Sequence, residues 1–268
     1  MVPAFEKDED ELPDGWEAAE RYHGLKRVLP KHQRQEVEDR AVREILRRAR
    51  DLLRHTSRPR HLVRDHFPAE GELDLDATLE HPRPWQSSDV ILQRTQLREA
   101  DVVVILDMSL SMTGDKIALT ALAAAILRLK LDHIAVVCFD TKAHELVAMA
   151  EPITPEDLVR RILRVPAQGF TNVDAGLKMG LDQLRRGGRR ERVGIVMTDG
   201  VANVGGDPVR RAAAFPLLHV VQVGEEEVQG TRACSAMARA GRGRRYRAEL
   251  YKDLPAVVRR LVRECFGT

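Results

Sequence analysis

The feature that most restricts the fold of this chain is an unbroken apolar run, Val-Val-Val-Ile-Leu, at residues 102–106. A strand with one face in water alternates apolar and polar residues, so a run without alternation predicts a strand that is buried on both faces. Such strands are typical of parallel sheets covered by helices on both sides. Asp107 follows the run directly and therefore falls on the loop at the carboxyl end of the strand.

After residue 100 this pattern repeats, and each short apolar segment alternates with a longer helical one. The repetition predicts an α/β fold, a doubly wound and mostly parallel sheet. Residues 140–144 are too few to hold a crossover helix, so residues 145–149 should form one antiparallel edge strand. The other expected strands are residues 102–106, 134–139, 193–198, 217–223 and 244–247. The expected helices are residues 115–131, 155–164, 174–186, 208–215, 231–240 and 253–265.

The first 99 residues are more charged and are punctuated by prolines. Val37, Ala41, Ile45, Ala49 and Leu52 recur at helical spacing and predict a helix over about residues 33–55, whose apolar stripe packs on the main domain. Residues 72–79 alternate apolar and polar side chains, which predicts a short strand or extended arm. We therefore divide the chain into a helical N-terminal extension, residues 1–99, and an α/β domain, residues 100–268.

Composition excludes several classes of protein. Lys and Arg number 43 against 41 Asp and Glu, so a net charge of +2 gives no general attraction to nucleic acid or to a membrane surface. The three cysteines are far apart and form no Cys-x-x-Cys pattern, which argues against a disulfide framework. The N-terminus lacks the basic and apolar segments of a signal peptide, and no run has the ~20 apolar residues of a membrane span. A cytoplasmic protein is expected.

Oxygen-bearing side chains follow the predicted strands and gather at one edge of the sheet. Asp107, Ser109 and Ser111 follow the first strand, Thr171 precedes a helix, and Asp199 follows a later strand. In an open α/β sheet such loops meet beyond the carboxyl ends of the strands. Hydroxyl and carboxylate oxygens are the ligands that Mg²⁺ prefers, with Mn²⁺ and Ca²⁺ as alternatives. Two carboxylates leave little surplus negative charge, so the ion would accept a further carboxylate from outside.

The set Asp107-x-Ser109-x-Ser111, Thr171 and Thr198-Asp199-Gly200 resembles the metal-ion-dependent adhesion site (MIDAS) of von Willebrand factor type A (VWA) domains. The resemblance covers about residues 100–265. It implies a Rossmann-like VWA fold, the metal ligands Asp107, Ser109, Ser111, Thr171 and Asp199 (direct or through water), and a protein partner that completes the metal with an acidic residue.

Leu110 departs from the pattern that this resemblance implies, because the family usually has glycine at its position. Either the loop keeps φ negative here or the site is remodelled. Leu110 and Met112 would also give the rim of the site an apolar contact for a partner.

The layout of the whole chain is similar to bacterial cytoplasmic VWA proteins that work with MoxR-type AAA+ ATPases. This resemblance implies an adaptor or co-chaperone that links the ATPase to a client protein. The alternative is a subunit of a complex that inserts Mg²⁺ or Co²⁺ into a tetrapyrrole. The sequence has no Gly-x-x-x-x-Gly-Lys-Ser/Thr loop, so the ATPase activity must come from another chain.

An enzyme is the competing class of protein. An aspartate after the first strand, here Asp107, also suggests a haloacid-dehalogenase-like phosphatase. That chemistry uses a second aspartate two residues on as general acid and base, and Ser109 occupies this position. The Gly-x-Ser-x-Gly elbow of a serine hydrolase is absent from the sequence. We therefore expect no catalytic residues.

Overall fold

The computed structural model describes residues 12–54, 60–67, 69–80, 86–97, 100–224, 227–250, 253–254, 256–258 and 260–261. The chain forms two compact units. The larger contains Met1–Thr56 and Ala100–Arg259, and the smaller contains Ser57–Glu99 with Arg260–Thr268. The N-terminal helices thus belong to the same unit as the α/β sheet, whereas the predicted division lay at residue 100. None of the described helices combines the length and apolar character that crossing a bilayer requires.

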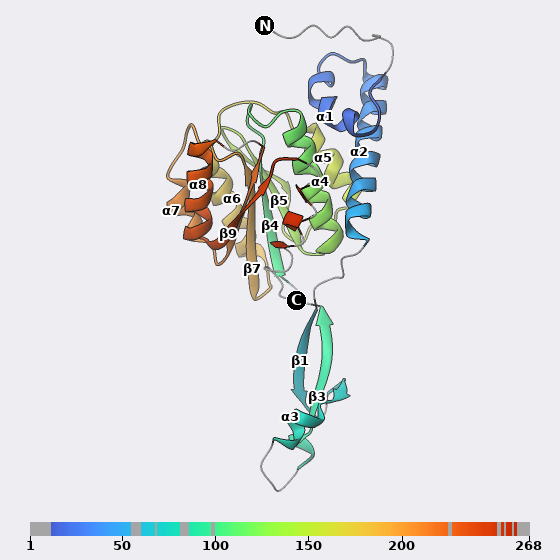
Figure 1. The fold of residues 1–268 in the computed structure, drawn as a ribbon, viewed down its shortest axis with the longest axis vertical. Coiled ribbons are helices and arrows are strands. Elements are labelled where there is room, and N and C mark those ends of the chain that lie inside the picture. The colour runs from blue at the N-terminus through green and yellow to red at the C-terminus, as the bar shows by residue number, and fades with distance from the viewer. Residues whose placement is uncertain are drawn as a thin grey trace. The chain divides into compact units, whose positions relative to one another are not determined.

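A six-stranded sheet forms the centre of the larger unit, in the order β6-β5-β4-β7-β8-β9 (Figure 1). β6 pairs antiparallel with β5, and the remaining pairs are parallel. This confirms the predicted mostly parallel sheet with one antiparallel edge strand. The strands are β4 (Ala100–Asp107), β5 (Ile134–Phe139), β6 (Ala143–Val147), β7 (Glu191–Thr198), β8 (Leu218–Val223) and β9 (Arg242–Ala248).

Helices cover both faces of this sheet. On one face lie α6 (Val173–Arg186), α7 (Pro208–Ala212) and α8 (Val228–Ala240), over a core that includes Phe139, Phe215 and Met237. On the other lie α4 (Asp115–Lys130) and α5 (Pro155–Arg164) (Figure 1). All eight residues of β4 are buried, as the unalternating apolar run predicts. Gly180 lets α6 approach the sheet, because a Cβ there would lie 2.5 Å from Cδ1 of Ile105.

Two helices precede the sheet in the sequence and pack in its unit. α2 (Lys31–Leu53) is the predicted long helix, and it buries Val37, Ala41, Ile45 and Ala49 against the unit. α1 (Gly15–Leu25) was not predicted, because its apolar content is low and its buried positions are small or polar, mainly Ala18, Ala19 and Tyr22. The predicted terminal helix, residues 253–265, lies largely outside the described residues.

The smaller unit contains a three-stranded antiparallel sheet, in the order β1-β3-β2. Its strands are β1 (Arg60–His66), β2 (Glu72–Leu73) and β3 (Ile91–Leu97), and a short helix, α3 (Leu75–Leu79), follows β2. The prediction of an extended segment over residues 72–79 holds for β2 and is wrong for α3. The Asp74 side chain accepts a hydrogen bond from the backbone N of Ala77 and so caps a helical turn that alternation alone does not indicate.

A buried carboxylate, Glu38 of α2, joins three helices of the larger unit. Its oxygens accept hydrogen bonds from the Tyr22 hydroxyl of α1 at 2.6 Å, Arg160 of α5 at 3.0 Å and Arg164 of α5 at 3.0 Å. Burial by itself raises the pKa of Glu38, but the hydrogen bonds from Arg164, Tyr22 and Arg160 outweigh it and lower the pKa. Lys26, which follows α1 directly, donates to the carbonyl of Val165 at 2.8 Å, just beyond the end of α5.

Replacing Glu38 with alanine should destabilise the fold strongly, because a buried tyrosine hydroxyl and two arginines lose their shared acceptor. We expect the free energy of unfolding in urea to fall by about 3 kcal/mol. Glu36→Ala is the matched control, since Glu36 is half exposed and pairs with Arg40 one helical turn away; its cost should stay below about 0.5 kcal/mol. Equal effects of the two variants would show that Glu38 does not hold the helices together.

His23 of α1 makes stability depend on pH. Burial, with Lys26 and Arg27 nearby, lowers the pKa of His23 to about 3. In the unfolded chain a histidine takes up its proton near pH 6.5. Between these values the unfolded state binds one more proton than the folded state, so stability is complete above pH 6.5 and falls as the pH falls towards 3.

A His23→Leu variant should therefore resist mild acid better than the parent protein. Between pH 6.5 and 4.5 the parent should lose about 2 kcal/mol more of its unfolding free energy than the variant does. The measurement is chemical unfolding at a series of pH values, in which the other titrating groups are common to both proteins. If the unfolding free energies of the two proteins changed in parallel with pH over this range, His23 would not be buried and neutral in the folded state.

Candidate metal centre

Asp107 is the last residue of β4 and is fully buried. Its Oδ1 accepts a hydrogen bond from the backbone N of Ser109 at 3.0 Å, and its Oδ2 accepts one from the Thr198 hydroxyl at 2.6 Å. Burial and, to a smaller extent, the nearby Asp199 together raise the pKa of Asp107 to about 6, against the lowering effect of these hydrogen bonds. The carboxylate is thus held in one orientation by both neighbouring segments.

The loop after β4 brings two hydroxyl groups side by side. The Oγ atoms of Ser109 and Ser111 lie 3.2 Å apart, and Ser109 is buried. Among the described residues only Ala150 and Arg242 are non-glycine residues with positive φ, so Leu110 fits this loop without left-handed backbone. Met112 is fully buried and does not belong to the rim, which corrects that expectation, whereas the Leu110 side chain is 66% exposed.

Thr171 comes from the loop before α6 and is buried. Its backbone N donates to the Asn203 side chain at 3.3 Å, and its carbonyl accepts from the backbone N of Asn203 at 3.0 Å. In the same loop, the backbone N of Gln168 donates to the carbonyl of Met108 at 3.1 Å. Thr171 is therefore tied to the loops that follow both β4 and β7.

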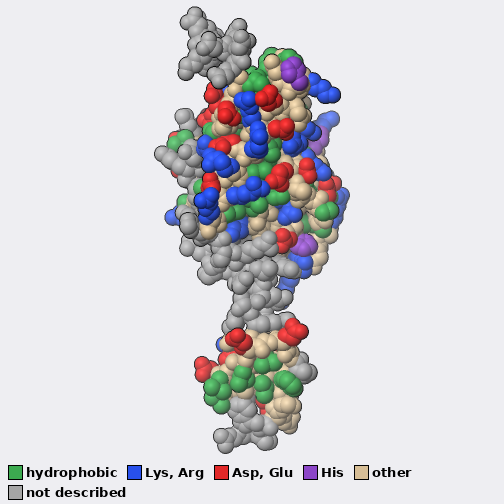
Figure 2. Space-filling view, turned by 90° about the vertical axis from the view of Figure 1, so that its right-hand side faces the viewer, with side chains coloured by type: hydrophobic (Ala, Val, Ile, Leu, Met, Phe, Trp, Pro, Cys, Tyr) green, Lys and Arg blue, Asp and Glu red, His purple; other side chains and the backbone are tan. Residues whose placement is uncertain are grey.

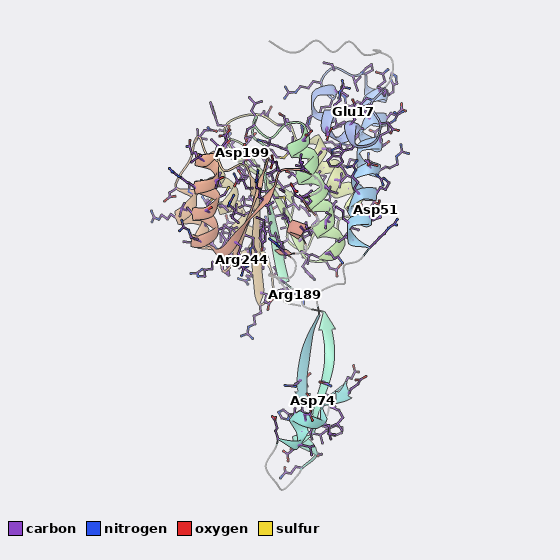
Figure 3. The ribbon with its side chains drawn as sticks, in the orientation of Figure 1. Glu17, Asp51, Asp74, Arg189, Asp199 and Arg244 are labelled. Atoms are coloured by element: carbon purple, nitrogen blue, oxygen red, sulfur yellow. The ribbon has the colours of Figure 1, made fainter. Side chains whose placement is uncertain are left out.

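Asp199 follows β7 directly and lies at the end of the sheet opposite to Arg189 (Figure 3). Its Oδ1 accepts from the backbone N of Val201 at 3.3 Å, and its Oδ2 pairs with the Lys116 ammonium of α4 at 3.2 Å. The next residue has to be glycine: Gly200 has φ +91°, and a Cβ there would lie 2.5 Å from the carbonyl oxygen of Gly230.

The chemistry of these side chains fits a hard divalent cation. Ser109, Ser111 and Thr171 offer neutral oxygens, and Asp107 and Asp199 offer carboxylates that bind directly or orient bound water. In the described part of the chain no three His, Cys, Asp or Glu side chains are grouped to hold a metal, so a cation here depends on the hydroxyls. Burial raises the pKa of the neighbouring Cys234 thiol to about 12, which keeps it protonated and unsuited to a thiolate site.

Sequence reasoning assigned no role to several residues that build this region. Thr198 both donates to Asp107 and accepts from the backbone N of Gly200 at 3.0 Å, so it links two predicted ligand segments. Lys116 carried no signal, because its pairing with Asp199 bridges 83 residues of sequence. Glu20 of α1 faces Asp115 at the start of α4; burial and this like charge raise the pKa of Glu20.

The parallel sheet with an antiparallel edge and this oxygen-rich site at its carboxyl end define a protein with a VWA domain. Residues 39–249 match the family described as VWA domain containing CoxE-like protein. The chain belongs to this family, and the match includes most of α2 as well as the sheet.

Solved structures support the fold. BatB from Bacteroides thetaiotaomicron, described as a conserved hypothetical protein, is 16% identical with a TM-score of 0.53 and covers 63% of this chain and 100% of that chain. Proximal thread matrix protein 1 from the mussel byssus, whose structure has zinc in its MIDAS motif, is 17% identical with a TM-score of 0.54; the match covers 63% of this chain and 46% of that one. A search of curated proteins by sequence gave no match.

The Lys116 ammonium should weaken metal binding, because it offsets the charge of Asp199 and repels a dication. Replacing Lys116 with methionine should raise the affinity for Mn²⁺, measured by electron paramagnetic resonance titration, about tenfold. Lys178→Met on the exposed face of α6 removes the same charge elsewhere and should leave the affinity within about twofold. If both variants changed the Mn²⁺ affinity equally, the net charge of the protein would explain the effect, and the contact between Lys116 and Asp199 would not.

Proposed function

We propose that this chain is a metal-dependent protein-interaction module, an adaptor between a MoxR-type AAA+ ATPase and a client protein. The observation that carries the proposal is the composition of the site. Two hydroxyls in contact, a buried threonine and two oriented carboxylates lie on loops that hydrogen bonds join at one end of the sheet. Ser109, Ser111, Thr171, Asp107 and Asp199 would hold Mg²⁺, with Mn²⁺ and Ca²⁺ as alternatives. When bound, the ion supplies a Lewis-acidic position for a carboxylate of the partner.

Exposed apolar side chains around the site support docking of a protein. Each of the three loops carries one: Leu110 is 66% exposed, Phe170 is 62% exposed and Val204 is 36% exposed. A small polar substrate gains nothing from such side chains, whereas a protein surface buries them. The partner therefore presents an acidic residue flanked by apolar ones.

Family membership supports the choice of an ATPase as partner. The chain belongs to the CoxE-like VWA proteins, and its layout resembles VWA proteins that work with MoxR-type ATPases. The sequence supplies no nucleotide-binding loop of its own. We place the protein in the cytoplasm, where these ATPases act, and assign it no catalytic residue.

The test is affinity capture of the tagged full chain from native lysate in Mg²⁺ and then in chelator, read by mass spectrometry. A MoxR-type ATPase should be retained in Mg²⁺ and released by chelator. Ser109→Ala should lose at least about tenfold in Mg²⁺ affinity and lose the ATPase with it. Ser88→Ala in the smaller unit is the matched control and should behave as the parent.

Three outcomes would contradict the adaptor role. Retention of the ATPase in chelator, or by Ser109→Ala, would show that the metal site is not the docking surface. Capture of a chelatase ATPase, with altered metallation of a porphyrin when this chain is added, would favour the tetrapyrrole complex. Thermal unfolding of Ser109→Ala checks that the variant is folded, because the Ser109 hydroxyl also contacts Ser111 and Asp107 within the protein.

A further inference from the structure

The smaller unit reverses the usual distribution of polar and apolar side chains. In helix α3 and the residues beside it, Asp74 and Thr78 are buried, at 6% and 3% exposure. Leu73, Leu75 and Leu79 are 52%, 56% and 59% exposed. Among the described side chains of residues 64–93 no apolar one is buried. Leucine normally fills the interior, so this reversal marks an apolar surface kept for another molecule.

Hydrogen bonds hold the reversed arrangement in place. The Asp74 carboxylate accepts from Arg64 Nε at 2.6 Å and from the backbone N of Ala77 at 3.1 Å. The Thr78 hydroxyl donates to the carbonyl of Asp74 at 2.7 Å and accepts from the backbone N of Ile91 at 2.9 Å. Because the polar side chains fix α3 to β3, Leu75 and Leu79, one helical turn apart, are presented outwards together.

Phe67, just after β1, is also exposed, at 49%, and the register of β1, β3 and β2 puts it on the same face of the sheet as Leu73. These four residues, Phe67, Leu73, Leu75 and Leu79, form what we call the arm patch. Figure 2 shows, on the visible face of this smaller body, hydrophobic side chains in one group with Asp and Glu side chains at its margin.

The charge around the arm patch restricts what can bind there. Residues 64–93 contain seven carboxylates and two arginines. Glu70, Glu72, Asp76 and Glu80 are exposed, and none of them forms an ion pair within the described residues. A surface of this sign repels nucleic acid and anionic lipid, although its leucines alone would suit a membrane.

We propose that the arm patch is a second docking surface, for a protein segment whose apolar side chains are flanked by Lys or Arg. The apolar residues of the partner would cover Leu73, Leu75, Leu79 and Phe67, and its cations would pair with the free carboxylates. This surface uses no metal. It would attract positively charged side chains, whereas the metal centre would accept a negatively charged carboxylate. One chain could thus hold two proteins of different chemistry.

The test uses a labelled synthetic amphipathic helix of leucine and lysine as probe, with the full chain and fluorescence anisotropy. The leucine–lysine peptide should bind at least about tenfold more tightly than a leucine–glutamate peptide or a serine–lysine peptide. Leu75→Ser/Leu79→Ser should lose at least about tenfold in affinity. Hydrogen exchange should show protection of residues 72–80 on binding.

Matched variants separate this surface from general properties of the chain. Val28→Ser/Val228→Ser removes two apolar side chains of the larger unit, 76% and 68% exposed, and should bind the probe as the parent does. Glu72→Gln/Glu80→Gln should bind more weakly and with less dependence on salt. Chelator and Ser109→Ala should leave probe binding unchanged, so this proposal and the metal-dependent function fail independently.

Four results would overturn the proposal. Unchanged probe affinity of Leu75→Ser/Leu79→Ser, or protection that does not include residues 72–80, would place the binding elsewhere. Self-association in ultracentrifugation that this double variant abolishes would make a second copy of the chain the occupant. Sedimentation with phosphatidylglycerol vesicles that depends on the two leucines would make it a lipid surface.

Discussion

The parallel pairing of β4 with β7 determines where the functional groups of this protein lie. The register places Leu106 opposite Met197, so Asp107 and Thr198 leave the sheet together and form a hydrogen bond of 2.6 Å. Because both strands are buried, neither can slip without exposing apolar side chains or burying unpaired polar ones. The loops that carry Ser109, Ser111 and Asp199 therefore start from fixed points. The Thr171 loop is added by backbone hydrogen bonds to Met108 and Asn203.

The N-terminal helices lie in the same compact unit as the six-stranded sheet. Glu38 is almost fully buried and accepts hydrogen bonds from α1 and α5. Removing it would leave these buried donors without their acceptor and so lower the stability of the fold. Through Glu20, α1 also approaches Asp115, the first residue of α4, a few residues after the serine loop. A helix outside the α/β core thus contacts the element that supports the proposed metal centre. The family match, which begins within α2, agrees with this extent.

The two proposed docking surfaces differ in what they recognise. The proposed metal centre would attract carboxylates through a cation, and its exposed Leu110, Phe170 and Val204 add apolar area. The arm patch attracts cations through its own carboxylates and presents leucines held outwards by a buried aspartate and threonine. An adaptor needs two partners that do not compete for one site, and opposite charge preferences provide this without any change of conformation.

The sequence by itself determined the α/β class, the antiparallel edge strand and most helix and strand positions, because strand burial and helical periodicity are local properties of the chain. It also identified Asp107, Ser109, Ser111, Thr171 and Asp199 by their order after strands; their role as metal ligands stays a prediction. Only the tertiary structure decided which groups meet across long stretches of sequence. The pairs Thr198 with Asp107, Lys116 with Asp199 and Glu38 with Arg164 are each more than 80 residues apart. The helical turn at Asp74 was decided in the same way: local alternation favours a strand there, but Arg64 and Ile91, from neighbouring strands, hold Asp74 and Thr78 inside and so place the leucines outside.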